Sequence, residues 1–183
     1  MPDATRPDPQ TPVAWLIRRA LPDDVPGLAA LAARTWSEAF ADGISPDDVA
    51  AELDETRSEA YFAAALRSPG RTVLVAVCDG RLAGYVQFGA VTISGMGVTS
   101  ADRGLQRLYV ATPLQGSGLG RRLLEAALGD PELARAPRVF LQVWEQNARA
   151  VALYKRAGFR RVGTTRFTVG AESLEDLVMV RVS

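Results

Sequence analysis

The stretch that most constrains the fold is residues 105–122, where an apolar strand pattern runs into a glycine-rich corner and then a basic, helix-forming segment. The corner carries glycine at three alternate positions, Gly116, Gly118 and Gly120. Glycine leaves the backbone amides uncovered by side chains, and the first amides of a following helix have no acceptor within that helix. Such a corner is typical of a site that binds an anion, most often a phosphate or pyrophosphate.

Two common phosphate-binding motifs do not fit this corner. A P-loop places a lysine directly after its last glycine, and no lysine follows these glycines. A dinucleotide-binding fingerprint counted from Gly116 requires glycine where Arg121 stands. A plain tight turn, with glycine present only for backbone freedom, stays open as the structural alternative.

Length and composition indicate one globular domain. The chain has 183 residues, of which 48% are hydrophobic and 23% charged, and its formal net charge is zero. We expect a single domain over residues 13–183, after a proline-rich, disordered lead-in at residues 1–12 that is not a secretory signal. The zero net charge gives no support to a nucleic-acid partner, and no apolar run approaches the ~20 residues of a membrane helix.

The residue types that are absent exclude several kinds of chemistry. The chain has no histidine, which removes Ser-His-Asp catalysis and His-ligated metals, and we expect no metal site. Its one cysteine, Cys78, cannot form an internal disulfide and is interpreted as a small core residue. A reducing, cytoplasmic setting fits this cysteine usage.

Hydrophobic periodicity predicts a mixed α/β fold. Asp79-Gly80 is a two-residue hairpin turn, so the strands on either side of it are antiparallel. A strand–helix–strand unit follows in the middle of the chain, and two antiparallel strands end it. Residues 92–104 are expected to form a loop and residues 130–137 a connector. The predicted strands are 13–19, 71–78, 81–91, 105–110, 139–144, 159–169 and 174–182, and the predicted helices are 23–40, 46–67, 116–128 and 147–158.

A second motif lies one strand after the corner. Residues 141–159 read Leu-Gln-Val-Trp-Glu-Gln-Asn-Ala-Arg-Ala-Val-Ala-Leu-Tyr-Lys-Arg-Ala-Gly-Phe. With the glycine corner, this stretch resembles the GNAT-type, acetyl-CoA-dependent N-acetyltransferases. The resemblance implies a central mixed sheet with helices on both faces and splayed parallel central strands that admit acetyl-CoA. By the same resemblance, the cofactor-binding residues are Leu108, Tyr109, Val110, Gln115, Gly116, Ser117, Gly118, Leu119, Gly120, Arg121, Asn147 and Tyr154.

The resemblance also implies catalytic roles. The backbone amide of Val110 would stabilise the oxyanion, and Tyr154 would act as general acid toward the departing thiolate. Asn147 is expected both to cap its helix and to bind the cofactor's pantetheine arm. Members of the family often use a glutamate as general base on the strand before the corner, where this chain has Gln106. Glu145, Tyr109 and an ordered water remain candidates for the base.

The acceptor side is less constrained. Residues 46–60 carry six acidic side chains against one arginine, which favours a cationic amine, although a solvated helix face explains them too. Trp36 and Phe40 share a helix face and are candidate acceptor contacts. We expect acetyl transfer from acetyl-CoA to a small cationic amine, by direct attack in a ternary complex. The strands 105–110 and 141–145 and the ending 167–179 resemble bacterial polyamine acetyltransferases.

Two other functions remain open. The chain is compatible with a protein N-terminal acetyltransferase of the ribosomal-protein type, and with a non-catalytic acyl-CoA-binding module. Many members of the resembled family pair through their C-terminal strands, so a homodimer is also an expectation.

Overall fold

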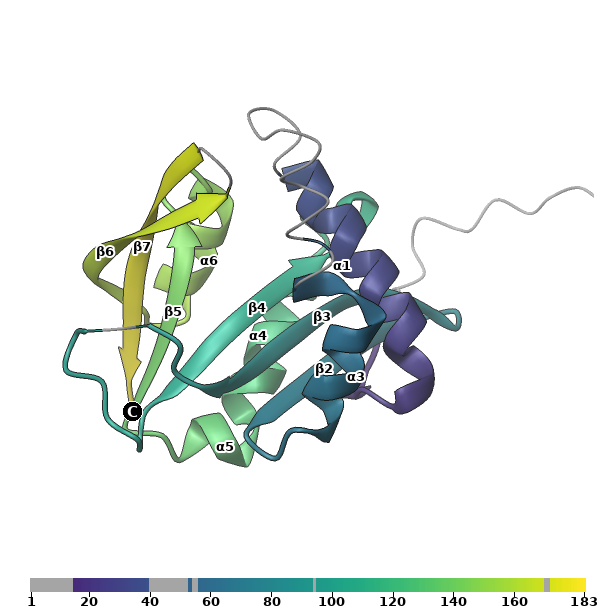
Figure 1. Cartoon of the computed structure of the whole chain (residues 1–183), viewed down its shortest axis with the longest axis horizontal. Coiled ribbons are helices and arrows are strands. Elements are labelled where there is room, and N and C mark those ends of the chain that lie inside the picture. The colour runs from purple at the N-terminus through teal and green to yellow at the C-terminus, as the bar shows by residue number, and fades with distance from the viewer. Residues whose placement is uncertain (1–14, 40–52, 54–55, 94, 170–171) are drawn as a thin grey trace, which may run out of the picture.

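The structure is a computed structural model that describes residues 15–39, 53, 56–93, 95–169 and 172–183. Its centre is one seven-stranded sheet in the order β1-β2-β3-β4-β5-β7-β6 (Figure 1). Every neighbouring pair is antiparallel except β4 and β5. The strands are β1 (Leu16–Arg19), β2 (Arg71–Cys78), β3 (Arg81–Ala90), β4 (Arg103–Val110), β5 (Arg138–Trp144), β6 (Arg160–Val169) and β7 (Glu172–Val182).

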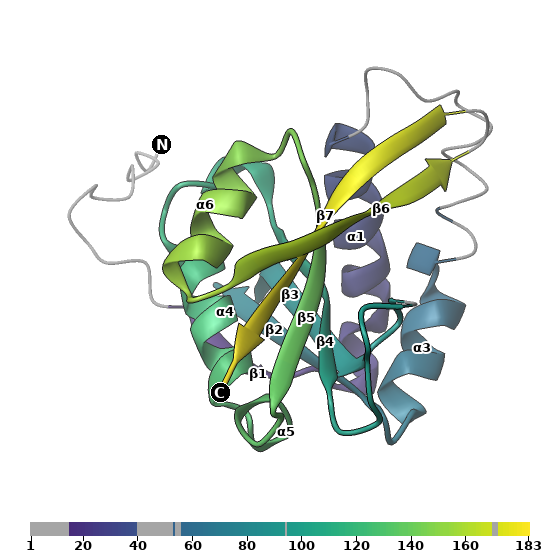
Figure 2. The ribbon, with the colours of Figure 1, turned by 90° about the vertical axis from the view of Figure 1, so that its left-hand side faces the viewer.

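Helices cover both faces of the sheet, as predicted (Figure 2). On one face, α1 (Val25–Ala39) and α3 (Glu59–Arg67) bury a core that includes Leu28, Phe62 and Tyr85. On the other face, apolar side chains of three helices pack on alternate residues of the central strands. These helices are α4 (Leu119–Gly129), α5 (Pro131–Ala134) and α6 (Ala148–Arg156).

The predicted hairpin and the predicted splay are both confirmed. Asp79 and Gly80 join β2 to β3 with φ of 49° and 73°, the left-handed values that a tight hairpin turn requires. β4 and β5 pair only near their N-terminal ends, where Arg103–Leu105 face Val139–Leu141. Beyond these residues the two strands separate, and β5 continues alongside β7 instead. The sheet therefore has a wedge-shaped opening between two neighbouring strands.

The structure corrects several predicted boundaries. The connector at 130–137 contains the short helix α5, which Asp130 caps through the amide of Glu132. The helix predicted from 116 begins at Leu119, because Gly116 and Gly118 adopt left-handed φ values. A 3₁₀ turn at Pro22–Asp24 precedes α1, and β4 begins two residues earlier than predicted.

Part of the predicted 46–67 helix lies outside the described residues, as do Phe40 and residues 1–12. Within the described part, α3 begins after Ser58, whose hydroxyl accepts a hydrogen bond from the amide of Tyr61. None of the helices that the structure describes combines the length and apolar character needed to cross a membrane.

Candidate active site

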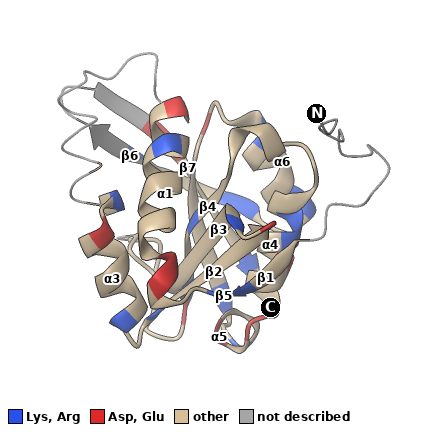
Figure 3. Cartoon of the chain, turned by 90° about the vertical axis from the view of Figure 1, so that its right-hand side faces the viewer, with Lys and Arg blue, Asp and Glu red and all other residues tan. Residues whose placement is uncertain are grey.

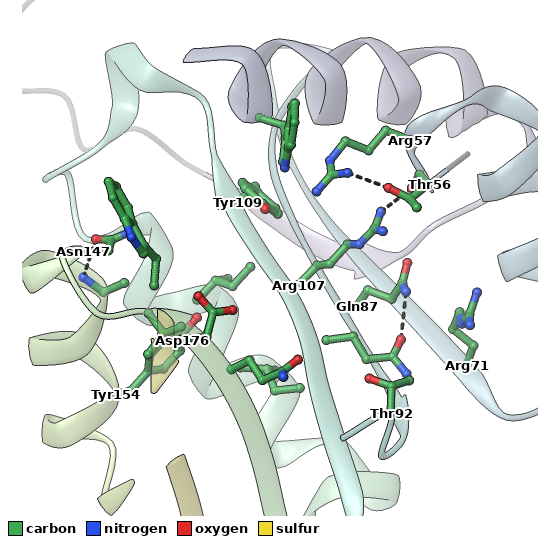
Figure 4. A pocket seen from close by; sticks show the side chains of 18 of the residues that line it. Thr56, Arg57, Arg71, Gln87, Thr92, Arg107, Tyr109, Asn147, Tyr154 and Asp176 are labelled. Carbon is green, nitrogen blue, oxygen red and sulfur yellow. Dashed lines mark hydrogen bonds between the residues drawn. The ribbon is translucent and has the colours of Figure 1, made fainter. Parts of the chain in front are cut away.

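The opening between β4 and β5 leads into a cleft of about 470 Å³ (Figure 4). Its walls come from α1, the start of α3, α6 and five strands of the sheet, β2, β3, β4, β5 and β7. The cleft therefore joins both faces of the sheet. Its lining includes Trp36, Arg57, Tyr61, Arg71, Gln87, Gln106, Arg107, Leu108, Tyr109, Gln142, Val143, Trp144, Asn147, Tyr154 and Asp176.

Part of the β4 backbone facing this opening has N–H and C=O groups that are not paired with a neighbouring strand. Val110 faces Gly84 in the register with β3, and the amide of the next residue, Ala111, donates to the carbonyl of Ala83 at 2.9 Å. Since hydrogen-bonded and non-hydrogen-bonded pairs alternate along an antiparallel ladder, the backbone groups of Leu108 and Val110 point away from β3 and toward the gap. The Val110 side chain does not line the cleft. It packs 3.7 Å from the position that a Cβ on Gly120 would occupy.

The glycine corner places free amides at the start of α4. Gly116 and Gly118 have φ of 89° and 90°, which a residue with a Cβ adopts only with strain. The first intrahelical hydrogen bond runs from the Arg122 amide to the Gly118 carbonyl at 3.2 Å, so the amides before it lie outside the helical ladder. Of these amides, that of Ser117 donates to the Leu114 carbonyl at 3.2 Å, and that of Leu119 makes a long contact of 3.4 Å with the Ser117 hydroxyl. This geometry fits the phosphate cradle that the sequence predicted.

Basic residues, blue in Figure 3, lie on α4 and α6 near the corner. The Gln115 amide donates to the Val110 carbonyl at 3.3 Å and accepts from Arg149 of α6 at 3.1 Å. This bridge brings a guanidinium next to Gly116, a cation that sequence reasoning missed because Arg149 lies 33 residues further along the chain. Arg121, in contrast, is exposed and pairs with Glu125 at 3.2 Å. Arg122 stacks over Trp15 at 5.3 Å.

The two polar residues of the second motif lie on α6 and at its start. Asn147 is the N-cap, and its side-chain oxygen accepts from the Ala150 amide at 3.0 Å, so the capping role is confirmed. Tyr154 lines the cleft at 7% exposure, with its ring edge-on to Phe159 at a centroid distance of 5.8 Å. Burial, assisted by nearby Tyr109, raises the pKa of the Tyr154 phenol above its usual range. The phenol is therefore a protonated donor at neutral pH.

A β-bulge turns two consecutive residues of β4 into the cleft. Gln87 of β3 faces Arg107 and Phe88 faces Leu105, which leaves Gln106 as the extra residue. The Gln106 amide accepts from Gln87 at 2.8 Å and donates to the Ala90 carbonyl at 2.9 Å. Gln106 therefore clamps β3 to the bulge, which gives this amide a structural reason to stand where a carboxylate base was expected.

The acidic rim predicted for the acceptor side falls mostly outside the described residues, and the described side of the cleft carries arginines. Trp36 lines the cleft under the guanidinium of Arg57, 4.7 Å from its ring. Most of the acidic residues between 46 and 60 lie outside the described residues. The one described carboxylate among them, Glu59, is exposed and does not line the cleft.

Asp176 is the cleft residue that sequence reasoning most clearly missed. It begins the buried part of β7, opposite Trp144 of β5, and burial raises the pKa of its carboxyl. Figure 4 shows Asp176 beside Tyr154 on the same side of the cleft. Of the predicted base candidates, Glu145 is exposed and outside the lining, whereas Tyr109 lines the cleft and stacks on Tyr85 at 5.6 Å.

Known proteins share this architecture. The model of the Acetyltransferase (GNAT) family matches residues 31–159. An uncharacterized N-acetyltransferase of Mycobacterium tuberculosis is 37% identical over 158 residues, which cover 86% of this chain and 97% of the relative. The PaiA N-acetyltransferase of Thermoplasma acidophilum, solved in complex with coenzyme A, superposes with a TM-score of 0.75 at 21% identity, covering 93% of this chain and 99% of that one.

Two relatives with assigned substrates match shorter stretches. The N-alpha-acetyltransferase RimI of Mycobacterium tuberculosis is 36% identical over 114 residues, 62% of this chain and 67% of the relative. The spermine/spermidine N(1)-acetyltransferase of Bacillus subtilis is 30% identical over 90 residues, 49% of this chain and 59% of the relative. Since the family model spans more than half of the sequence, the chain belongs to the GNAT family of acetyltransferases and is an acyltransferase.

Proposed function

We propose that the protein transfers the acetyl group of acetyl-CoA to a primary amine by direct attack in a ternary complex. The observation that carries this proposal is the exposed backbone of β4 at Leu108 and Val110, which faces the gap beside the buried phenol of Tyr154. A pantetheine arm pairs with such a strand edge as an added strand would. The free amides of the glycine corner suit the pyrophosphate at the other end of the cofactor.

Acetyl-CoA supplies a thioester-activated acetyl group. In the proposed reaction the amine nitrogen forms the new C–N bond, and the C–S bond of the thioester breaks. The Val110 amide stabilises the negative charge that develops on the acetyl oxygen. Tyr154, which burial keeps protonated, gives a proton to the departing sulfur.

The proton that leaves the amine needs an acceptor, and we assign this role to Asp176. Its carboxyl lies in the cleft with Tyr154, and burial raises its pKa toward that of the ammonium group that it must deprotonate. Gln106 cannot accept this proton, and its amide is already held by Gln87 and Ala90. The proton that Tyr154 loses is restored from solvent, so the products are an N-acetylated amine and free coenzyme A.

The acceptor is a small amine or the amine of a peptide. The relatives' names support both, because one acts on spermine and spermidine and the other is an N-alpha-acetyltransferase. The polyamine expectation rests on the resemblance of three stretches to polyamine acetyltransferases and on acidic residues that lie mostly outside the described part of the chain. The described cleft contains more positive than negative side chains, which favours other amines over a polyamine.

A thiol-release assay with acetyl-CoA tests the activity. The panel contains polyamines, amino acids, phosphorylated amines, aminoglycosides and peptides with free N-termini, and mass spectrometry locates the acetyl group on the product. Acceptor-dependent release of free thiol is the expected result. Tight binding of coenzyme A without release for any acceptor would favour the acyl-CoA-binding module instead.

A homodimer is proposed on the position of β6 at one edge of the sheet, beside the C-terminal strand β7. An edge strand exposes backbone groups that a second copy can pair with. Light scattering coupled to size exclusion should give twice the mass of the chain, and a monomer mass at all concentrations would contradict this proposal.

A further inference from the structure

The charge of the acceptor half of the cleft is positive among the described residues. Arg57, Arg71 and Arg107 line it, and Asp176 is the one carboxylate that the described lining contains. Arg71 and Arg107 take part in none of the ion pairs between described residues. A half-enclosed cleft with low-dielectric walls concentrates the field of such charges and attracts anions.

Arg71 and Arg107 converge on one aromatic ring. The guanidinium carbon of Arg107 lies 4.5 Å from the centroid of Tyr61, and that of Arg71 lies 5.5 Å from the same centroid. Arg107 is held in place by a 2.5 Å hydrogen bond from Nη1 to the carbonyl of Thr56. Contact with a ring is a weak compensation for two like charges, whereas a bound anion would neutralise them.

The hydroxyl of Tyr61 adds a donor at the same place. Gln87 Nε2 donates to Tyr61 Oη at 2.8 Å, so the phenol oxygen acts as an acceptor there and its own hydrogen is directed elsewhere. Two guanidinium groups and one hydroxyl are the donors that bind carboxylates and phosphates in proteins. The bulge at Gln106 creates this arrangement, because it turns Arg107 into the cleft.

We propose that the acceptor is a primary amine that also carries a carboxylate or phosphate, which Arg71, Arg107 and Tyr61 bind. This inference rests on the proposed function and names the substrate class of the same site. Arg107 precedes Val110 by three residues, about 10 Å along an extended strand. The anionic group of the acceptor therefore lies several bonds from the nitrogen that is acetylated. Figure 4 shows Arg71 and Arg107 across β4 from Asp176 and Tyr154, where the amine would react.

Matched acceptors separate the anionic group from the rest of the molecule. Lysine differs from cadaverine only by a carboxylate, and 5-aminovalerate differs from butylamine in the same way. Phosphoethanolamine differs from ethanolamine only by the phosphate. We expect kcat/KM to be at least about tenfold higher for the anionic member of a pair. The carboxylate and phosphate pairs distinguish the two sources of the anion.

Variants test whether the arginines cause this preference. Arg71→Met and Arg107→Met should each reduce the preference for the anionic acceptor about tenfold, and Arg107→Lys should restore part of it. The KM for acetyl-CoA should stay the same in all three variants. Arg71→Met is the safer variant, because the Arg71 guanidinium lies over the ring of Tyr61 and makes no hydrogen bond or ion pair with another described side chain. Arg135→Met, at an exposed position after α5, is the matched control.

Two results would overturn the inference and leave the proposed function intact. One is a wild-type preference for spermidine or cadaverine over lysine, and the other is an unchanged acceptor preference in Arg71→Met. If the protein acetylates no amine, the proposed function fails first. Calorimetry of 5-aminovalerate and phosphoethanolamine with the coenzyme A complex then tests the anion site alone, and absence of binding refutes it.

Discussion

The two halves of the cleft are built in different ways. The donor half consists of the β4 edge, the glycine corner and α6, and its functional groups are mostly backbone amides from two short stretches of sequence. The acceptor half takes side chains from α1, α3, β2, β3, β4 and β7, which are spread over most of the chain. Backbone groups determine which donor binds, because their positions are set by the fold. The choice of acceptor depends on a few charged side chains that a substitution can change. Variants on the donor side should therefore change turnover or cofactor binding, and variants on the acceptor side should change substrate choice.

The largest effect is expected for Tyr154→Phe, at the border between the two halves. Loss of the phenol proton removes the donor to the departing sulfur, and kcat should fall about 100-fold. The dissociation constant of coenzyme A should stay within about twofold, because the ring and its packing against Phe159 remain. Single-turnover rates and calorimetry measure the two quantities.

Tyr85→Phe is the matched control for Tyr154→Phe. It removes another buried hydroxyl, one that has no hydrogen-bond partner among the described residues. The control should keep full turnover. Equal rates for Tyr154→Phe and the wild type would refute the general-acid role.

The next effect is expected for Asp176→Asn, which removes the proposed base and keeps the shape of the side chain. We expect kcat/KM at pH 7 to fall roughly 30-fold, since water takes over part of the proton transfer. The acid limb of the pH profile that belongs to this carboxylate should disappear. A profile identical to that of the wild type would assign the proton to another group.

The same variant has a stability readout with a defined sign. Burial raises the pKa of Asp176 in the folded protein, so the carboxyl favours folding below its unfolded pKa and loses that contribution as the pH rises through the folded value. Asp176→Asn should therefore raise the melting temperature at pH 7, by about 2 °C. The difference should vanish near pH 4. A lower melting temperature at pH 7 would show that the carboxylate has a stabilising partner.

A smaller effect, confined to the donor, is expected for Gly118→Ala. At φ of 90° a Cβ costs roughly 1–2 kcal/mol of strain. The backbone would relieve this strain by changing conformation, which would turn the amides of the corner away from the pyrophosphate. The KM for acetyl-CoA should rise about tenfold, with little change in kcat or in the KM for the acceptor. Gly129→Ala is the control, because Gly129 ends the same helix without a positive φ. A change in acceptor KM alone would break the division between the halves.

The backbone geometry of the donor half follows from local sequence signals, whereas the arrangement of side chains in the acceptor half does not, for a physical reason. Alternate glycines and the Asp79-Gly80 turn are local signals, because the backbone conformation that they permit is decided within a few residues. The convergence of Arg71 and Arg107 on Tyr61 depends on strand register and on a bulge, which no local pattern encodes. Asp176 lies within residues 167–179, the stretch near the C-terminus that resembles polyamine acetyltransferases. Only the pairing of β7 with β5 brings it into the cleft.

The smallest effect on catalysis is expected where β4 and β5 are still paired, at the narrow end of the opening that both halves of the cleft share. Asp102, just before β4, accepts two hydrogen bonds from Arg138 at the start of β5, at 2.6 and 3.0 Å, and a third from the Thr99 amide at 2.7 Å. This pair joins the two parallel strands where they are still in register. The hydrogen bonds from Arg138 and Thr99 hold the pKa of the Asp102 carboxyl at about 2 against an ordinary value of 3.8.

Asp102→Asn should lower the melting temperature at pH 7 by roughly 5 to 10 °C, since it removes the carboxylate charge that pairs with the Arg138 guanidinium. Because the folded pKa lies below the unfolded one, the pair stabilises the protein above about pH 4, and the gap between variant and wild type should close as the pH falls toward 2. The KM values for acetyl-CoA and for the acceptor should change by less than about threefold and by the same factor. Glu125→Gln, which breaks an exposed pair on α4, should shift the melting temperature by less than about 2 °C. A change in only one of the two KM values would contradict the idea that the Asp102–Arg138 pair supports both halves of the cleft equally.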